Sequence, residues 1–149
     1  MKTNLIFGFL FICGFISCGN TETDKQLTVV QDFFTQWINF KSTGEFLITH
    51  FEKTSIHEEH NEGFGSFYVL KWTAKGSPNK NIRLASTSLP DGYIQDIQIV
   101  MEEPKEKVKS PTICTFYQKG SVIQFSGECY LQCKEDIWKI MAMKIKDVQ

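Results

Sequence analysis

The residues with the clearest chemical potential are three histidines and several glutamates between positions 50 and 62. The set comprises His50, His57, His60, Glu58, Glu59 and Glu62. Imidazole and carboxylate groups bind zinc and related metals, and His57 and His60 would share one face of this stretch if it were helical. The HExxH arrangement is absent, however, and a solvated charged loop explains the same residues. We therefore predict no metal at these histidines and no cofactor.

The same histidines could act in acid–base catalysis. One of them, together with Asp96 inside a pocket, could transfer a proton to or from a substrate. Asp96 is expected on a strand among polar neighbours, where an exposed, non-catalytic position explains it equally well. The sequence alone does not bring together a nucleophile, a base and an orienting group.

Three cysteines in the second half of the chain could form a disulfide if the protein is exported. They are Cys114, Cys129 and Cys133. We expect Cys129 and Cys133 on one strand, where their spacing separates them by about 13 Å, beyond the ~4.4–6.8 Å that a bridge allows. Any bridge would then involve Cys114. The alternative is that all three are small apolar residues of a sheet. The cysteines show no CxxC spacing, which disfavours a zinc site.

The N-terminus has the layout of a secretion signal. Lys2 is followed by an apolar run over residues 5–16 and by the small residue Ser17. The run is shorter than the roughly 20 residues that a membrane-spanning helix requires. We therefore predict a removable leader.

The segment Phe15-Ile16-Ser17-Cys18-Gly19 resembles the lipobox of bacterial lipoproteins, in which the cysteine is acylated and becomes the new N-terminus. This resemblance implies a signal peptide over 1–17, lipid attachment at Cys18 and a short tether over 18–23. Acyl chains would hold the protein on a membrane. Gly19 stands where aspartate often marks inner-membrane retention, so the resemblance implies the outer membrane. The alternative is an ordinary secretory leader whose cysteines are incidental.

The charge balance disfavours nucleic acid as the main partner. The chain has 16 Lys and Arg against 17 Asp and Glu, for a formal net charge of −1. A protein that binds nucleic acid needs a basic excess to neutralise phosphates. Residues 24–149 have the length of one domain with a single core.

Two helices are predicted at the start of this domain. Leu27, Val30, Phe33, Phe34 and Trp37 recur at three- and four-residue steps, which indicates an amphipathic helix with an aromatic core stripe. Residues 42–45 contain a glycine and a capping pattern, which predict a break and a restart. A second helix is expected to about residue 53, followed by a polar loop over 53–65.

Six strands are predicted after this loop. They cover residues 67–74, 82–89, 93–101, 112–118, 121–133 and 137–145. Pro90-Asp91-Gly92 predicts a tight turn, and Lys119-Gly120 predicts a hairpin between the fourth and fifth strands. Gly127 inside the fifth strand predicts a bulge or bend, and the charged, proline-containing stretch 102–111 predicts an exposed connection.

These elements predict an α+β domain in which two N-terminal helices pack on a curved, mainly antiparallel sheet of about six strands. The opening VVQDFFTQWINF and the closing DIWKIMAMKI are similar to the first helix and last strand of the cystatin-like cone folds, especially the nuclear-transport-factor-2-like superfamily. That superfamily includes enzymes and pure binding modules. The resemblance therefore implies a cone-like fold without fixing a function.

Two functions of different classes remain. The first is a lipid-anchored envelope lipoprotein without catalytic activity, whose sheet binds a small apolar molecule or an envelope protein. The second is a small hydrolase, lyase or isomerase that uses a His or Asp in a pocket. The first is favoured, because the domain is rich in aromatic residues and poor in catalytic groups.

Overall fold

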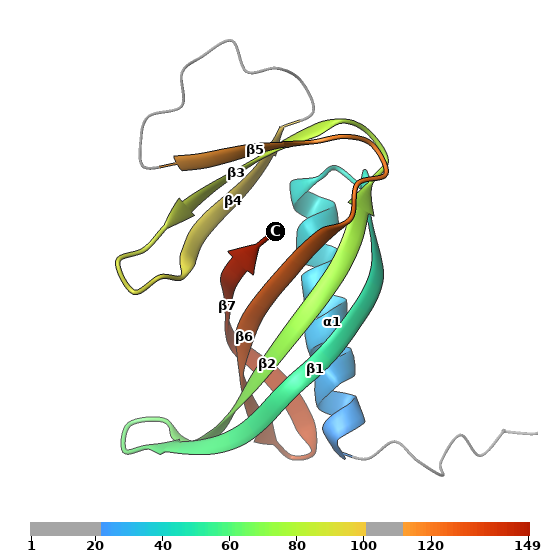
Figure 1. Cartoon of the computed structure of the whole chain (residues 1–149). Helices are drawn as coiled ribbons and strands as arrows, with labels where there is room; N and C mark the ends of the chain where they lie inside the picture. The colour runs from blue at the N-terminus through green and yellow to red at the C-terminus, as the bar shows by residue number, and fades with distance from the viewer. Residues whose placement is uncertain (1–21, 101–111) are drawn as a thin grey trace, which may run out of the picture.

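The computed structural model describes residues 22–100 and 112–149, which form one helix followed by seven strands (Figure 1). The helix α1 spans Glu22–Lys41. The strands are β1 (Phe46–Asn61), β2 (Gly65–Pro78), β3 (Ile82–Ser88), β4 (Ile94–Val100), β5 (Thr112–Tyr117), β6 (Ile123–Lys134) and β7 (Ile137–Val148). The predicted α+β class is confirmed. The six predicted strands correspond to β2 to β7, but the sheet has a seventh strand, β1, and one helix in place of the two predicted. The leader, Cys18 and the connection after β4 lie outside the described residues.

Helix α1 packs on the sheet with a row of apolar side chains that differs from the predicted stripe. Val30, Phe34 and Ile38 are fully buried, whereas Trp37 is only partly buried. The prediction that Phe33 belongs to the core is wrong, because its side chain is 43% exposed. Adjacent residues of a helix point about 100° apart, so a helix that turns Phe34 toward the sheet leaves Phe33 on its flank.

The helix ends at the predicted break. Gly44 has a φ of 80°, a conformation that glycine adopts at little cost, and Thr43 before it has a φ of 52°. The Gly44 N–H donates to the Asn39 carbonyl at 2.8 Å. This local geometry ends α1 and lets the chain turn back as a strand.

The predicted second helix and the predicted polar loop are both wrong, because residues 46–61 form the single long strand β1. Two bulges explain the helix-like spacing. Ile48 and His50 face consecutive residues of β2, as do Lys53 and Ser55, so Thr49 and Thr54 are extra residues. Each bulge shifts the alternation of side chains by one position, which leaves inward residues three apart in sequence.

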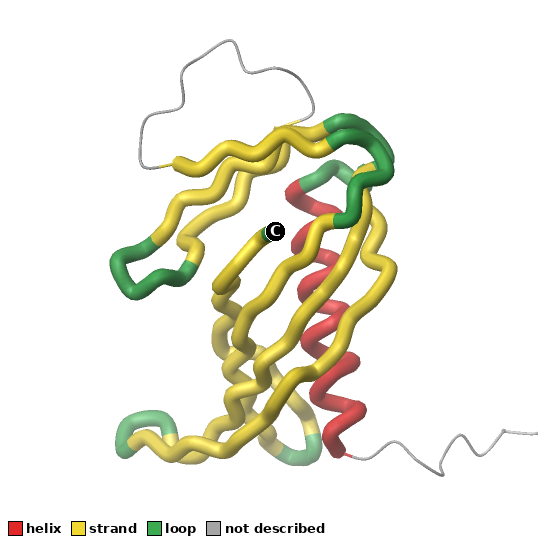
Figure 2. Tube along the Cα trace, viewed as in Figure 1, coloured by secondary structure: helices red, strands yellow, loops and turns green. Residues whose placement is uncertain are grey.

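The strands form one antiparallel sheet in the order β1-β2-β6-β7-β4-β3-β5. It consists of two parts, and among the described residues these parts pair with each other only at Ile94 and Ile145. Figure 2 shows α1 lying against one side of the larger part, β1-β2-β6-β7, while β3, β4 and β5 form a smaller part beside one end of it. Most of β7 therefore has β6 as its only described neighbour in the sheet.

The predicted hairpin between β5 and β6 is wrong, although a turn is present at Lys119-Gly120. Strand β5 pairs with β3, and β6 pairs with β2 and β7. The turn is fixed to the β2–β3 connection, since the Gly120 N–H donates to the Pro78 carbonyl at 2.9 Å and the Lys119 N–H to Asn81 Oδ1 at 2.8 Å. The chain consequently crosses from the smaller part of the sheet to the larger one.

The core lies between α1 and the larger part of the sheet. The Phe34 ring lies 4.7 Å from the Trp72 ring and 5.4 Å from the Phe125 ring, measured between centroids. Gly127 allows this packing, because a Cβ at that position would lie 2.6 Å from Trp72 Cζ2. The register of β6 with β7 shifts between Ser126 and Gly127, but the extra residue is Lys146 on β7. Strand β6 itself pairs with β2 without a shift across Gly127, so the predicted bulge does not lie in β6.

In residues 22–100 and 112–149, no helix combines the length and apolar character that crossing a bilayer requires.

Candidate functional site

The three candidate histidines lie on β1 and are exposed to solvent. His57 and His60 are three residues apart on a strand without a bulge between them, so their side chains point to opposite faces. The helical arrangement that would bring them together is therefore wrong. Within the described part of the chain, no three His, Cys, Asp or Glu side chains are grouped closely enough to hold a metal ion.

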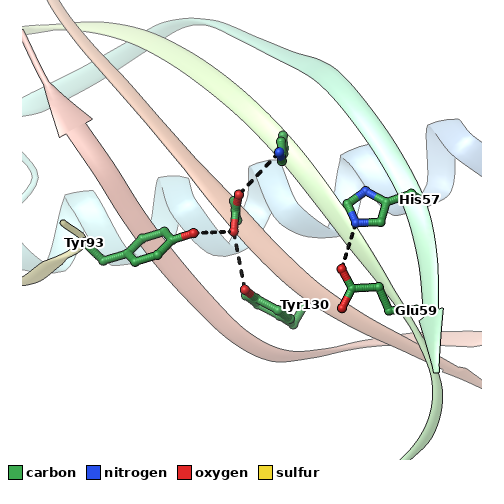
Figure 3. Close-up of polar contacts among 6 residues, drawn as sticks. His57, Glu59, Tyr93 and Tyr130 are labelled. Carbon is green, nitrogen blue, oxygen red and sulfur yellow. Dashed lines mark hydrogen bonds and ion pairs between the residues drawn. The ribbon is translucent and has the colours of Figure 1, made fainter. Parts of the chain in front are cut away.

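Each histidine instead contacts a polar side chain nearby. His57 Nε2 lies 2.9 Å from Glu59 Oε1, as Figure 3 shows, and His50 Nε2 lies 3.3 Å from Glu52 Oε2. Hydrogen bonds from His50 and Thr73 lower the pKa of Glu52. These pairs join residues two apart on one strand face, an arrangement that any exposed strand can provide. Asp96 lies opposite Thr87 in the β3–β4 register, and its side chain is outside the described set.

The three cysteines of the domain lie apart and form no disulfide with one another. All three are free thiols, and Cys129 and Cys133 lie on β6 as predicted. Cys114 is exposed on β5 opposite Ala85, away from the β6 ladder. Burial raises the pKa of the Cys129 thiol to about 12, so this thiol stays protonated and unreactive at neutral pH.

A buried carboxylate, Glu128, lies at the centre of a polar cluster on the sheet face turned away from α1. Its side chain is 11% exposed. Tyr93 Oη donates to Glu128 Oε2 at 2.8 Å and Tyr130 Oη donates to the same oxygen at 3.3 Å, as Figure 3 shows. Lys71 Nζ lies 3.7 Å from the other oxygen, Oε1. Both oxygens of the carboxylate therefore have partners.

Strand register explains why this cluster forms. Glu128 on β6 lies directly between Lys71 on β2 and Lys144 on β7. The Lys144 ammonium lies 4.8 Å from the centroid of the Tyr93 ring and 5.4 Å from that of Tyr130, so it contacts both rings as a cation. Cross-strand pairs of opposite charge stabilise such positions.

The two tyrosines act as hydrogen-bond donors in this cluster. The hydrogen bond to Glu128, followed by desolvation, raises the pKa of Tyr93 to about 12. Desolvation and the charge of Glu128 raise the pKa of Tyr130. Neither phenol is a base at neutral pH, and the cluster fastens the β3–β4 hairpin to β6. This cluster is not among the sites predicted from the sequence. Glu128 is the only charged residue between Ile123 and Cys133, and that isolated charge in an otherwise uncharged strand is the signal that points to it.

A small cavity lies where the two parts of the sheet meet. Its volume is about 110 Å³, and its lining includes Ser86, Thr115, Tyr117 and Asp147. Desolvation raises the pKa of Tyr117, and the charge of Asp147 adds to this effect. The cavity is smaller than the ~300 Å³ at which pockets for small organic ligands begin.

A larger open groove runs between α1 and β7. Its volume is about 520 Å³, within the range of ligand sites. It is lined by Val29, Asp32, Phe33, Gln36, Lys139 and Ile140. Three of these side chains, Val29, Phe33 and Ile140, are apolar, and Asp32 and Lys139 add one acid and one base. The exposed ring of Phe33 lines this groove, so the residue that departs from the predicted core stripe is part of its surface.

The groove and the Glu128 cluster occupy different faces of the sheet and suit different roles. The cluster has paired polar groups and holds the two parts of the sheet together, whereas the groove leaves apolar surface open to a partner. Comparison with known proteins found no matching family model, no matching curated protein and no matching solved structure.

Proposed function

We propose that the protein is a lipid-anchored lipoprotein of the cell envelope that acts as a non-catalytic binding module. The groove between α1 and β7 is the binding surface in this proposal. It binds a small apolar molecule or apolar side chains of an envelope protein.

The observation that carries this proposal is the position of Phe33. Its ring is 43% exposed and lines the groove, although the helix has a fully buried row beside it. Full burial of a large apolar side chain contributes about 1.5–3 kcal/mol relative to full exposure, and Phe33, at 43% exposed, lacks only part of that contribution. A ligand or partner that covers Phe33 recovers part of that energy, which makes the groove favourable for apolar contacts.

The arrangement of titratable groups supports binding over catalysis. The histidines of β1 are exposed and paired with residues on the same strand or its neighbour. Glu128 is held by two phenols and a lysine on a different face from the groove. A general base needs an accessible acceptor next to a substrate, and neither set places one in the groove. The groove's own titratable groups are Asp32 and Lys139, and its lining includes no histidine.

The cone-like fold and the membrane location are also part of the proposal. One helix lying against a curved antiparallel sheet supports the resemblance to the nuclear-transport-factor-2-like superfamily (Figure 1). The lipobox-like residues support an anchor at Cys18 and the outer membrane. Mass spectrometry of the mature N-terminus should find acyl chains on Cys18, and Cys18→Ala should abolish partitioning into detergent. An unmodified N-terminus would contradict the anchor.

Photo-cross-linking in intact cells tests the groove. A benzoylphenylalanine placed at Phe33 should form an adduct with whatever occupies the groove. The same probe at Phe64, a phenylalanine at the β1–β2 turn that is more exposed (68%) and lies outside the groove lining, is the control. We expect an adduct from position 33 and none from position 64. Equal yields at the two positions, or none at 33, would overturn the proposal.

A further inference from the structure

The groove between α1 and β7 carries a carboxylate that has no partner among the described residues. Asp32 lies on α1 next to Phe33, and both side chains line the groove. The Asp32 side chain is exposed, and within residues 22–100 and 112–149 it forms neither an ion pair nor a side-chain hydrogen bond. A free carboxylate beside apolar surface selects a ligand that carries a positive charge.

The lysine of the groove lining points away from this carboxylate. Trp138 is buried and Ile140 packs against the core, so the side chains of these two residues face α1. Successive side chains of a strand point to opposite faces, so Lys139 projects from the other face and only borders the groove. The nearest base on α1 itself is Lys25, whose Cα lies about 10 Å from that of Asp32 along the helix axis. Among the described residues, Asp32 is therefore the charged side chain on the α1 side of the groove.

Two neighbours of Asp32 favour an amine as the charged group. The Phe33 ring is 43% exposed, and the face of an aromatic ring attracts a cation. Gln36 follows Asp32 by one helical turn, so the two side chains are neighbours on the helix surface. Its carbonyl oxygen and the carboxylate are both acceptors, and an ammonium group is a donor only. Val29 and Ile140 supply apolar contacts beside these groups.

We infer that the groove binds a small cationic amphiphile, an apolar molecule that carries a primary or secondary amine. Its ammonium group lies between the Asp32 carboxylate and the Phe33 ring, and its apolar body covers Val29, Phe33 and Ile140. The groove volume of about 520 Å³ suits a molecule of this size class. This inference rests on the proposed function, and it narrows the ligand from any apolar molecule to one with a positive charge.

The test compares two fluorescent probes that share one apolar body, dansylcadaverine and its neutral N-acetyl derivative. The full chain is held in nanodiscs of zwitterionic lipid, and the signal of empty nanodiscs is subtracted. The amine should bind about tenfold tighter than the neutral probe, because it adds an exposed charge pair and a cation–π contact. Asp32→Asn should remove this preference and leave the affinity for the neutral probe unchanged.

Three further variants make the test specific to Asp32. Asp136→Asn is the matched control, since Asp136 is exposed in the β6–β7 turn outside the groove lining and its φ of 61° is one that asparagine also adopts. This variant and Lys139→Gln should both keep the preference for the amine. Asp32→Lys should reverse it, so that a dansyl probe ending in a carboxylate binds tighter than dansylcadaverine.

Equal affinities of the wild type for the amine and the neutral probe would overturn the inference. A preference for the amine that survives Asp32→Asn and Asp32→Lys would overturn it as well. In both cases, saturable binding of the neutral probe that Phe33→Ser weakens would leave the proposed function standing. If neither probe binds saturably, the proposed function fails together with the inference.

Discussion

Tyr93 donates a hydrogen bond of 2.8 Å to Glu128 across thirty-five positions of sequence, and this bond joins the β3–β4 hairpin to the central strand β6. The two parts of the sheet otherwise pair at a single position, Ile94 with Ile145. The hydrogen bond therefore supplements a narrow connection between the two parts. Its partners lie on strands that are distant in sequence, and only the folded register brings them together.

We expect Tyr93→Phe to destabilise the protein by about 1–3 kcal/mol, because the hydrogen bond to the Glu128 carboxylate is lost while the ring remains. Urea unfolding would measure the change. Tyr130→Phe serves as the comparison, since its bond to the same oxygen is longer at 3.3 Å and should contribute less. A larger loss of stability for Tyr130→Phe than for Tyr93→Phe would show that the bond from Tyr130, and not the bond from Tyr93, contributes more.

The same hydrogen bond makes the stability of the protein depend on pH above about 10, because it raises the pKa of Tyr93. The pKa of Tyr93 is raised to about 12 in the folded state, against about 10 in the unfolded chain. The folded state therefore holds a proton that the unfolded state loses, so the contribution of this group is complete below pH 10 and disappears as the pH rises to 12. Stability measured over this window should fall less steeply in Tyr93→Phe than in the wild type. Identical slopes would contradict the assignment.

Gly127→Ala should destabilise the protein by about 1–3 kcal/mol through overpacking. Its new Cβ would lie 2.6 Å from the Trp72 ring, which is buried on all sides. Gly63→Ala is the matched control, because that glycine lies in an exposed turn where the nearest atom, Asn61 Oδ1, is 3.3 Å away. Thermal unfolding should show a clear loss for position 127 and little change for position 63.

The helix offers a comparison between two neighbouring aromatic residues. Phe34→Ala should cost about 3–5 kcal/mol, because it leaves a cavity beside Trp72 and Phe125. Trp37→Ala should cost less, since Trp37 is only partly buried. Equal losses of stability for the two variants would mean that Trp37 is as deeply buried as Phe34, which the sequence pattern alone predicts.

The sequence predicted those elements whose pattern is local. Strands β2 to β7 and the turn at Pro90-Asp91-Gly92 follow from alternation and turn chemistry, and the turn is present with a Gly92 N–H to Leu89 carbonyl bond of 3.0 Å. Strand β1 was missed, because the bulges at Thr49 and Thr54 displace its inward residues to helix-like spacing.

The sites were harder to predict than the elements. The Glu128 cluster depends on which strands are neighbours, and Lys71, Glu128 and Lys144 meet only because β6 lies between β2 and β7. The spacing of apolar residues in a helix predicts which of them share a face. It does not predict how the helix is rotated about its axis relative to the sheet, and for this reason the predicted burial of Phe33 is wrong. Tertiary packing decides that rotation, and it exposes Phe33 in the groove.

Binding of an apolar fluorescent probe to the purified domain, at protein concentrations low enough to keep it monomeric, tests the central claim most directly. The wild type should bind the probe saturably, and Phe33→Ser should weaken its affinity about tenfold, because part of the apolar contact in the groove is lost. Phe64→Ser, at an exposed phenylalanine outside the groove, should leave the affinity unchanged. Equal affinities for wild type and Phe33→Ser, or no saturable binding, would contradict the proposal that the groove is the functional surface.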